Sequence, residues 1–469
     1  MKLNFTLLYY FLLLICIINI MACSESEDTE TYFTSEIELP DKVTFTEHLA
    51  KIVHINCTPC HRPGEAGPFN LITYEDLRRR ASTIVEVTQS GFMPPWPANP
   101  NYSRFANERF LTDYEKDLFK KWVQDGAEKG DPDKMPAPPT FPEHNVLGEP
   151  DLVLNFPIVD IPAGNEDLFL IMKVPYELEK DTFIRLIEFV PGQRDVVHHM
   201  NANLIQFEKD LKSDVFDGLP FIETKDMRSR ENMHERLGLL HDDGTYPRLT
   251  PMVANYLPGV EYYPYPEGIG GYFMSRKGAF YINDMHYGSS PLAVSDSSRF
   301  NIYFSDAPPK RPVQEIILGT LGISEIVPPL IIPPDTVMKF TTEATVSIDI
   351  SLLTINPHMH LLGKSFKAYA ITPQNDTIPL IEIPRWDFRW QYFYTFKNML
   401  KIPAGSRVIA EGVYDNTENN PLNPHSPPEI VAERDGSMKT TDEMFQFIVT
   451  FVPYVAGDEN ISLEESAKK

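Results

Sequence analysis

The sequence predicts several domains: a small all-α domain followed by two all-β sandwich domains. Three observations lead to this fold class: apolar residues at helical spacing before residue 130, a proline-rich stretch at 131–150, and alternating apolar and polar residues after it. A chain of 469 residues has room for roughly three domains of about 150 residues each. Its 42 prolines disfavour an all-helical protein, because proline breaks helix interiors and suits turns between short strands.

The composition is that of a folded, acidic protein. Apolar residues make up 42% of the chain and charged residues 23%, which argues against wholesale disorder. The formal net charge of -24 repels phosphate backbones, so we expect no nucleic-acid partner. The four cysteines are Cys16, Cys23, Cys57 and Cys60, so no disulfide can stabilise the region that follows Cys60.

Residues 1–22 have the pattern of a signal peptide, with a positive charge before a nearly continuous apolar stretch. The stretch ends in Ile20-Met21-Ala22-Cys23, which resembles the lipobox of bacterial lipoproteins. That resemblance implies that Cys23 is lipidated after cleavage and that acyl chains hold the protein to a membrane. The alternative is a plain signal peptide with a chance cysteine. We expect an exported, membrane-anchored lipoprotein facing the periplasm or the cell surface, with residues 23–35 as an acidic tether.

Residues 36–130 contain a haem-attachment pattern. Cys57-Thr58-Pro59-Cys60-His61 is C-x-x-C-H, a spacing at which two thiols form thioethers with one haem while His61 reaches the iron. A zinc site would need a second ligand pair at matching spacing, and the sequence has none. A thioredoxin-like redox pair would not require His61. Cys57, Cys60 and His61 are therefore predicted to bind haem c.

Helices are predicted on both sides of this motif. Phe45, Leu49 and Val53 share one helical face before it, and Thr112-x-x-Glu115 forms a capping box after it. This order resembles the small c-type cytochromes, whose second axial ligand is a downstream methionine. The resemblance implies that Met93 is this ligand; the alternative is that Met93 packs in the core. His and Met ligation suits an electron carrier rather than oxygen activation.

The stretch at 131–150 is a proline-rich linker, and the rest of the chain is strand-like. Val346, Ile348 and Ile350 alternate with polar residues. Similar runs occur at 151–156, 182–190, 300–304 and 445–452. Proline and glycine separate such runs, as is typical of β-sandwiches, and the length favours two of them. We place them at 151–308 and 309–460, before a tail at 461–469.

Five histidines in this region occur in three motifs: the pair His198-His199, the single His286 and the tripeptide His358-Met359-His360. Residues i and i+2 of a strand share a face, so His358 and His360 can chelate one metal. Adjacent residues such as His198 and His199 can share a metal only at a bulge or a twisted strand end. A lone His-x-His pair is more often a surface or core feature, but the combination favours metal binding.

Asp442-Glu443-Met444 completes an ordered set of four motifs, which resembles the copper type II, ascorbate-dependent monooxygenases. This family includes peptidylglycine alpha-hydroxylating and dopamine beta-hydroxylating enzymes. The resemblance covers about 150–455 and implies two jelly-roll-like sandwiches, each folding a distant ligand back onto a local pair. Its residue assignments give two ligand sets. The electron-transfer copper would be held by His198, His199 and His286, and the O2-binding copper by His358, His360 and Met444.

Two departures from the family matter. Animal members are rich in disulfides, whereas this region has no cysteine. Peptide-amidating members hold the peptide carboxylate with an Arg and a Tyr, and those positions here are Asn356 and Ile448. The loss of an Arg clamp makes a peptidylglycine substrate doubtful.

The sequence therefore predicts a copper-dependent monooxygenase that hydroxylates a C–H bond of a small organic substrate with O2. The expected cofactors are two copper ions and one covalent haem c. We expect the haem to re-reduce the coppers, and the electron donor to be a redox-protein partner or ascorbate. One alternative is a non-catalytic haem and copper electron carrier. Another is a haem-only cytochrome with an adhesive β region, which would leave six ordered ligands unexplained.

Overall fold

The computed structural model describes residues 38–141, 145, 147–226, 230–260, 262–433 and 439–464. The predicted signal peptide at 1–22, the lipidation site Cys23 and the tether at 23–35 lie outside these residues, as does the end of the tail. The chain divides into two compact units, 1–41 and 42–469. Among the described residues, no helix is long and apolar enough to span a membrane.

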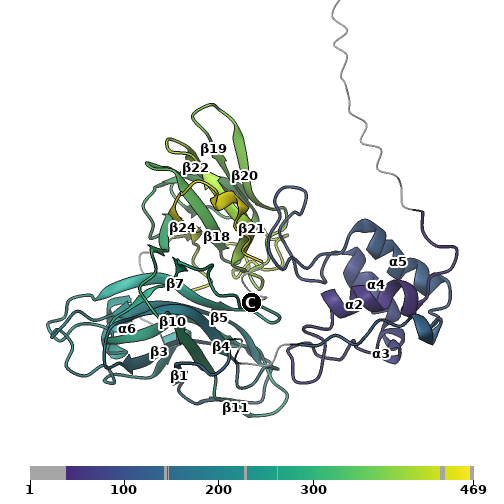
Figure 1. Cartoon of the computed structure of the whole chain (residues 1–469), viewed down its shortest axis with the longest axis horizontal. Coiled ribbons are helices and arrows are strands. Elements are labelled where there is room, and N and C mark those ends of the chain that lie inside the picture. The colour runs from purple at the N-terminus through teal and green to yellow at the C-terminus, as the bar shows by residue number, and fades with distance from the viewer. Residues whose placement is uncertain are drawn as a thin grey trace, which may run out of the picture. The chain divides into compact units, whose positions relative to one another are not determined.

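Helices occur mainly before residue 130 (Figure 1). They are η1 (Phe45–Leu49), α2 (Ala50–Asn56), α3 (Tyr74–Arg79), α4 (Ala81–Gln89), α5 (Asp113–Gln124) and η2 (Pro132–Lys134). The predicted capping box is confirmed: Thr112 Oγ1 accepts from Glu115 N at 3.2 Å, and the Glu115 carboxylate accepts from Thr112 N at 2.8 Å. Trp122 is fully buried, and its indole N–H donates to Glu128 O. Residues 42–134 are called the helical module below.

The first β-sandwich is built from two antiparallel sheets. The four-stranded sheet has the order β1-β12-β4-β9, with bounds Leu152–Asn155, Arg299–Phe304, Thr182–Val190 and Phe273–Met274. The five-stranded sheet has the order β6-β3-β10-β5-β7, with bounds Phe221–Glu223, Leu168–Glu177, Lys277–Tyr287, Val197–Gln206 and Arg248–Tyr256. Phe280 of one sheet and Phe300 of the other lie 4.8 Å apart by ring centroids, within one buried cluster.

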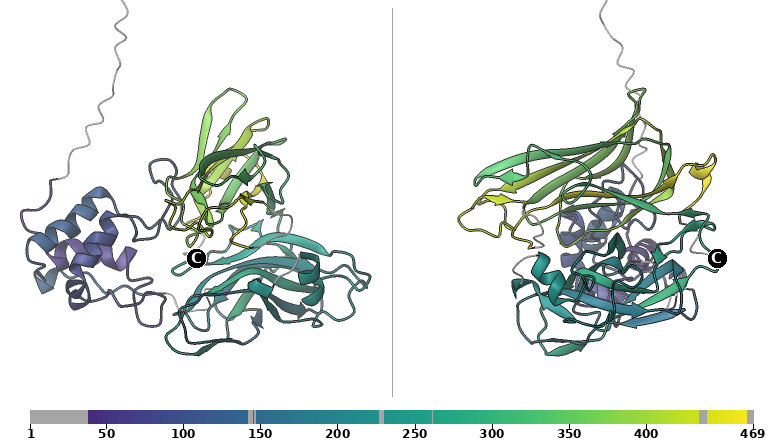
Figure 2. Two further views of the ribbon diagram at one scale, coloured as in Figure 1. Left: turned by 180° about the vertical axis from the view of Figure 1, so that it is seen from behind. Right: turned by 90° about the vertical axis from the view of Figure 1, so that its left-hand side faces the viewer.

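The second β-sandwich repeats this plan with later strands (Figure 2). Its four-stranded sheet is β14-β24-β18-β21, at Gln314–Gly319, Phe445–Pro453, Ile350–Met359 and Tyr394–Ile402. Its five-stranded sheet is β15-β17-β22-β19-β20, at Ile326–Val327, Thr336–Thr345, Arg407–Asn416, Gly363–Ile371 and Thr377–Ile383. Phe366 and Phe447 meet between the two sheets, with centroids 5.8 Å apart.

Short elements complete the described β region. The remaining strands pair as β2 (Val159–Ile161) with β11 (Val294–Asp296), β8 (Ile269–Gly270) with β13 (Arg311–Pro312), and β16 (Ile331–Ile332) with β23 (Val431–Ala432). Two short helices are η3 (Thr224–Asp226) and α6 (Arg230–Arg236), and a third, η4 (Asp458–Asn460), follows β24. The prediction of β-sandwiches after the linker is confirmed.

One predicted strand begins later than expected. Val346 and Ile348 lie in the turn between β17 and β18, and only Ile350 belongs to a strand, as the first residue of β18; Ile348 is half exposed. Asp349 connects this turn to the end of β21 and the turn that follows it, accepting from Ala404 N at 2.8 Å and pairing with Lys401 at 3.1 Å. The period of two is therefore produced by a turn in which one apolar side chain faces solvent.

The helical module also contributes to the second sandwich, which the sequence did not reveal. Ala98 and Phe105 belong to the buried core of that sandwich. Asn99 N donates to Glu382 O at 2.7 Å, and Ala106 N donates to Thr395 O at 2.8 Å. The linker at 131–150 is thus not the only connection between the module and the β region.

Candidate metal centres

The His-x-His pair lies where β18 ends, beside β24. The register pairs His358 with Gln446 and Met359 with Phe445, so Met444 follows directly beyond the paired residues. The rings of His358 and His360 are 5.0 Å apart and nearly perpendicular. Both rings and Met444 line one cavity of about 560 Å³. Strand pairing therefore brings a distant methionine to the local histidine pair.

Hydrogen bonds decide which ring nitrogens of this pair carry protons. His358 Nδ1 bonds to Gln391 Oε1, and His360 Nδ1 bonds to Asp442 O at 2.9 Å. Both acceptors are oxygens without a proton, so each Nδ1 donates and each Nε2 carries the lone pair. Burial lowers the pKa of His358 to about 3 and also lowers that of His360. Neutral imidazoles with an available Nε2 are the form that binds a metal.

Glu443 connects the two sequence-distant parts of this site. Its carboxylate accepts backbone N–H groups from His360 at 3.0 Å, Leu362 at 2.7 Å and Met444 at 3.3 Å. Burial acts to raise the pKa of Glu443, and these three bonds oppose that rise by stabilising the carboxylate. Sequence reasoning used Glu443 only as a neighbour of Met444 and missed this role.

The histidines of the other predicted copper site, His198, His199 and His286, lie where β5 pairs with β10. His199 is paired with His286, and Tyr287 is paired with Val197, so the ladder shifts at His198. This is the irregularity that adjacent histidines require if they are to share a site. The His286 ring lies 4.7 Å from the His198 ring and 4.8 Å from the His199 ring.

Carboxylates orient two of these rings. His199 Nε2 bonds to Asp284 Oδ2 at 2.8 Å, and His286 Nε2 bonds to Asp167 Oδ2 at 3.0 Å. Each Nδ1 therefore carries the lone pair. His286 Nδ1 is buried and has no hydrogen-bond partner among the described residues. Burial lowers the pKa of His286 to about 4, so the ring is neutral at pH 7.

The orphaned nitrogen is the observation that fits a metal at this cluster. A buried polar atom without a partner is costly, and a metal ion would satisfy it. Within the described ranges, no group of three or more His, Cys, Asp or Glu side chains is arranged to hold a metal ion as it stands. The case for copper at this cluster therefore rests on donor chemistry: three imidazoles suit copper, and carboxylates support two of them.

The predicted haem ligands lie in the helical module. Cys57 and Cys60 are free thiols, and burial raises the pKa of Cys57 to about 12. Thiols of this kind are not activated redox cysteines. His61 Nδ1 donates to Phe69 O at 3.0 Å, which leaves Nε2 for iron. Met93 is half buried in the loop after α4, where its N–H donates to Val87 O. The thiols and His61 fit a covalent haem.

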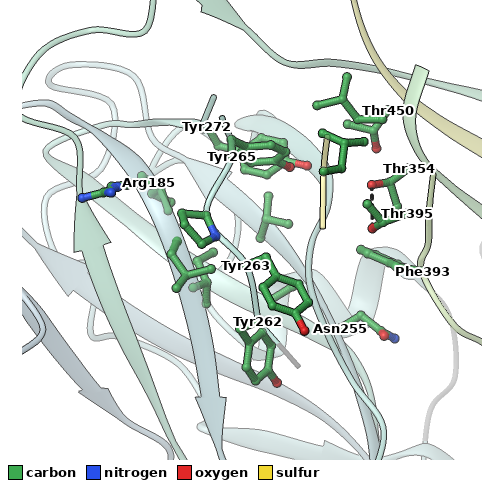
Figure 3. Close-up of a pocket in the computed structure, with 18 of the residues that line it drawn as sticks. Arg185, Asn255, Tyr262, Tyr263, Tyr265, Tyr272, Thr354, Phe393, Thr395 and Thr450 are labelled. Atoms are coloured by element: carbon green, nitrogen blue, oxygen red, sulfur yellow. Dashed lines mark hydrogen bonds between the residues drawn. The ribbon is translucent and has the colours of Figure 1, made fainter. Parts of the chain in front are cut away.

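A second cavity, of about 180 Å³, is lined by both sandwiches (Figure 3). Its wall includes Tyr262, Tyr263, Tyr265 and Tyr272. None of the predicted metal ligands lines it. We therefore assign the candidate chemistry to the larger cavity.

Known proteins resemble parts of this chain. Residues 319–425 match the family model described as copper type II ascorbate-dependent monooxygenase, C-terminal domain. MOXD1 homolog 2 of Drosophila melanogaster is 24% identical over 189 residues, which cover 36% of this chain and 24% of the relative. The chain thus spans about a quarter of the length of this curated relative.

Two solved structures are similar at low scores. The infectious bursal disease virus VP2 subviral particle shares 7% identity over 68% of this chain and 75% of its own, with a TM-score of 0.18. PNGF-II shares 9% identity over 64% of this chain and 65% of its own, with a TM-score of 0.23. Scores at this level bear on neither fold nor function. The family match therefore shows that residues 319–425 are similar to the C-terminal domain of copper type II ascorbate-dependent monooxygenases.

Proposed function

We propose that this protein is a copper-dependent monooxygenase that inserts one atom of O2 into a C–H bond of a small organic substrate. The second oxygen atom leaves as water, and two electrons are supplied. The observation that carries the proposal is the meeting of His358, His360 and Met444 at one cavity, with both imidazoles held by Nδ1.

The side chains have separable tasks in this reaction. Copper bound by two imidazoles and a thioether would supply the one-electron chemistry with O2, since thioether favours Cu(I). Gln391 and the Asp442 carbonyl hold the two rings in the metal-binding tautomer. Asp167 and Asp284 do the same for the three-histidine cluster, which would hold the electron-transfer copper.

The cavity wall favours a substrate without a carboxylate. Ile448 lines the cavity, and Asn356 instead donates its amide to Tyr392 O at 2.9 Å. These are the positions at which peptide-amidating members hold a carboxylate. Lys225, also in the wall, is paired with Glu223 at 2.6 Å. Asn203 and Asn283 add neutral amides to the wall, which also contains Asp284 and Lys439. We propose a small substrate that is bound without an Arg clamp.

We further propose that a haem c, bound through Cys57, Cys60 and His61 with Met93 as axial ligand, supplies the electrons. A donor fused to the enzyme has a high effective concentration at the copper site. Export and lipid anchoring at Cys23 belong to the same proposal. A diffusing redox protein or ascorbate would then reduce the haem.

Substrate-stimulated O2 uptake tests the proposed activity. Copper-loaded protein is screened against small neutral compounds, and hydroxylated product is identified by mass. We expect uptake and product together, both lost in His358→Ala. The matched control is His425→Ala, a partly exposed histidine outside both clusters. If copper is bound but none of the compounds stimulates O2 uptake, the result would favour a non-catalytic electron carrier.

A further inference from the structure

One loop contacts the helical module and both histidine clusters. Residues 384–393, here called the 384–393 loop, connect β20 to β21. In the sequence the loop lies between the His-x-His pair and Met444. It therefore belongs to neither predicted ligand set, and its contacts need a separate explanation.

On one side, the loop binds the 91–96 segment of the helical module, which contains Met93. Arg385 Nη2 donates to the carbonyl of Gly91 at 3.1 Å. The Arg389 guanidinium lies 5.4 Å from the centroid of the Phe92 ring. A further contact with the module is aromatic and is described next. The loop is thus fixed beside the predicted axial ligand of the haem.

Tyr392 provides the aromatic contact with the module. Its ring centroid is 5.4 Å from that of Trp96, which follows Met93 by three residues. Trp390 stacks on the other side of the same tyrosine, with centroids 6.2 Å apart and planes 12° apart. Three aromatic rings therefore follow one another from the module into the loop.

On the other side, the loop reaches the histidine clusters. Gln391 Oε1 accepts from His358 Nδ1, and Gln391 Nε2 donates to Phe388 O at 2.8 Å, which fixes the orientation of the amide. The Phe388 ring lies 5.7 Å from the His360 ring and 6.2 Å from the His199 ring. One loop thus contacts a ligand from each predicted copper site.

These contacts form a continuous path. The Trp96 ring contacts the Tyr392 ring, a peptide bond joins Tyr392 to Gln391, and the Gln391 side chain is hydrogen-bonded to His358. Together these links connect Trp96 to His358. Gln391 is buried, and the bond from Asn356 Nδ2 to Tyr392 O fixes the peptide between them. Chains of packed side chains and hydrogen bonds are one physical means by which two sites are coupled.

We propose that the 384–393 loop is an internal electron-transfer junction, in which Trp96, Tyr392 and Gln391 connect the haem to the copper of His358 and His360. The inference rests on the proposed function. In each transfer a ferrous haem becomes ferric and one Cu(II) becomes Cu(I). Ascorbate or a redox protein then re-reduces the haem. Two transfers supply the two electrons of one hydroxylation.

The test follows the haem absorbance after reduced, copper-loaded protein is mixed with O2. We expect Tyr392→Leu to slow the copper-dependent haem oxidation by about tenfold, the scale on which the loss of a supporting contact at a metal site is felt. Tyr392→Phe keeps the ring and should behave as wild type. Tyr454→Leu removes a tyrosine that packs on Lys401, away from this loop, and serves as the matched control.

Trp96→Leu tests the same path from the module, so a folding defect in one variant leaves the other to decide. The copper-to-iron ratio of each variant shows that both sites are loaded. Wild-type oxidation rates in Tyr392→Leu and Trp96→Leu, at unchanged copper content, would overturn the junction. Haem oxidation that is equally fast in copper-free and copper-loaded wild type would instead reject haem delivery itself, and the junction with it.

Discussion

At the residue scale, hydrogen bonds determine which nitrogen of each histidine could take a metal. His358 and His360 are bound through Nδ1, whereas His199 and His286 are bound through Nε2. The two clusters therefore present opposite ring nitrogens. This difference comes from partners that the sequence motifs do not contain, apart from Asp442. It predicts that removing a partner weakens one copper site and spares the other.

Glu443→Gln should weaken the His358 site. Glutamine has one carbonyl oxygen for the three N–H groups that the carboxylate now accepts, and its NH2 group would face a backbone N–H. We expect copper affinity at this site to fall about 10- to 100-fold, as for other losses of ligand support. Competition with a Cu(I) chelator measures it. Unchanged affinity in a folded variant would show that the carboxylate is not needed to position the ligands.

Asp167→Ala should weaken the three-histidine site instead. The variant frees His286 Nε2 and no longer fixes the tautomer. A loss of about 10- to 100-fold in copper affinity is expected, with the other site unaffected. Asp160→Ala is the matched control, because Asp160 is an exposed acid that bonds to Ser295 rather than to a histidine. Equal effects of the two variants would argue against a role for Asp167 at a metal.

At the element scale, local sequence patterns predicted helix caps and strands well, whereas contacts between residues distant in sequence could not be predicted. The capping box at Thr112 and the strands at 182–190 and 445–452 appear where expected, because caps and period two are local. The register shift at His198 meets the condition that two adjacent histidines set for a shared site. Asp167 and Gln391 were missed, since only tertiary folding brings them to His286 and His358. Asp284 and Asp442 had a local signal, because each lies two residues before a predicted ligand.

The capping box also predicts a measurable stability effect. Thr112→Ala removes the oxygen that accepts the Glu115 N–H at the start of α5. We expect the free energy of unfolding of the helical module to fall by about 0.5–2 kcal/mol. Denaturant titration followed by Trp fluorescence measures the change. Thr112→Ser keeps the cap and should stay close to wild type, and a loss of the same size in both variants would contradict this origin.

At the scale of the whole molecule, polar contacts join segments that are distant in sequence. Glu315 of β14 accepts from Tyr272 at 3.1 Å and from Thr450 at 3.2 Å, and its Oε2 is buried without a partner among the described residues. Tyr272 lies in the first sandwich region and Glu315 in the second. Glu65 of the module likewise contacts the first sandwich. Its two carboxylate oxygens accept from Arg194 Nη1 at 2.9 and 2.8 Å, and Arg194 lies four residues before His198.

Glu315 predicts how stability depends on pH. Burial raises its pKa to about 8, above the usual value of 4.5 for an exposed glutamate. Between pH 4.5 and about pH 8, the folded state therefore binds more protons than the unfolded state. The stabilisation is fully present below pH 4.5 and is lost as pH rises toward 8, by about 1.4 kcal/mol per pH unit. Glu315→Gln should flatten this slope in denaturant titrations, and an unchanged slope would contradict it.

The central proposal is that one chain binds two copper ions and one haem. The most direct measurement is the copper-to-iron ratio of the purified, mature protein after loading with Cu(I) and desalting. The account predicts two coppers per haem iron in the wild type and one in His358→Ala. No retained copper in the wild type would contradict the enzyme assignment, whatever the haem content.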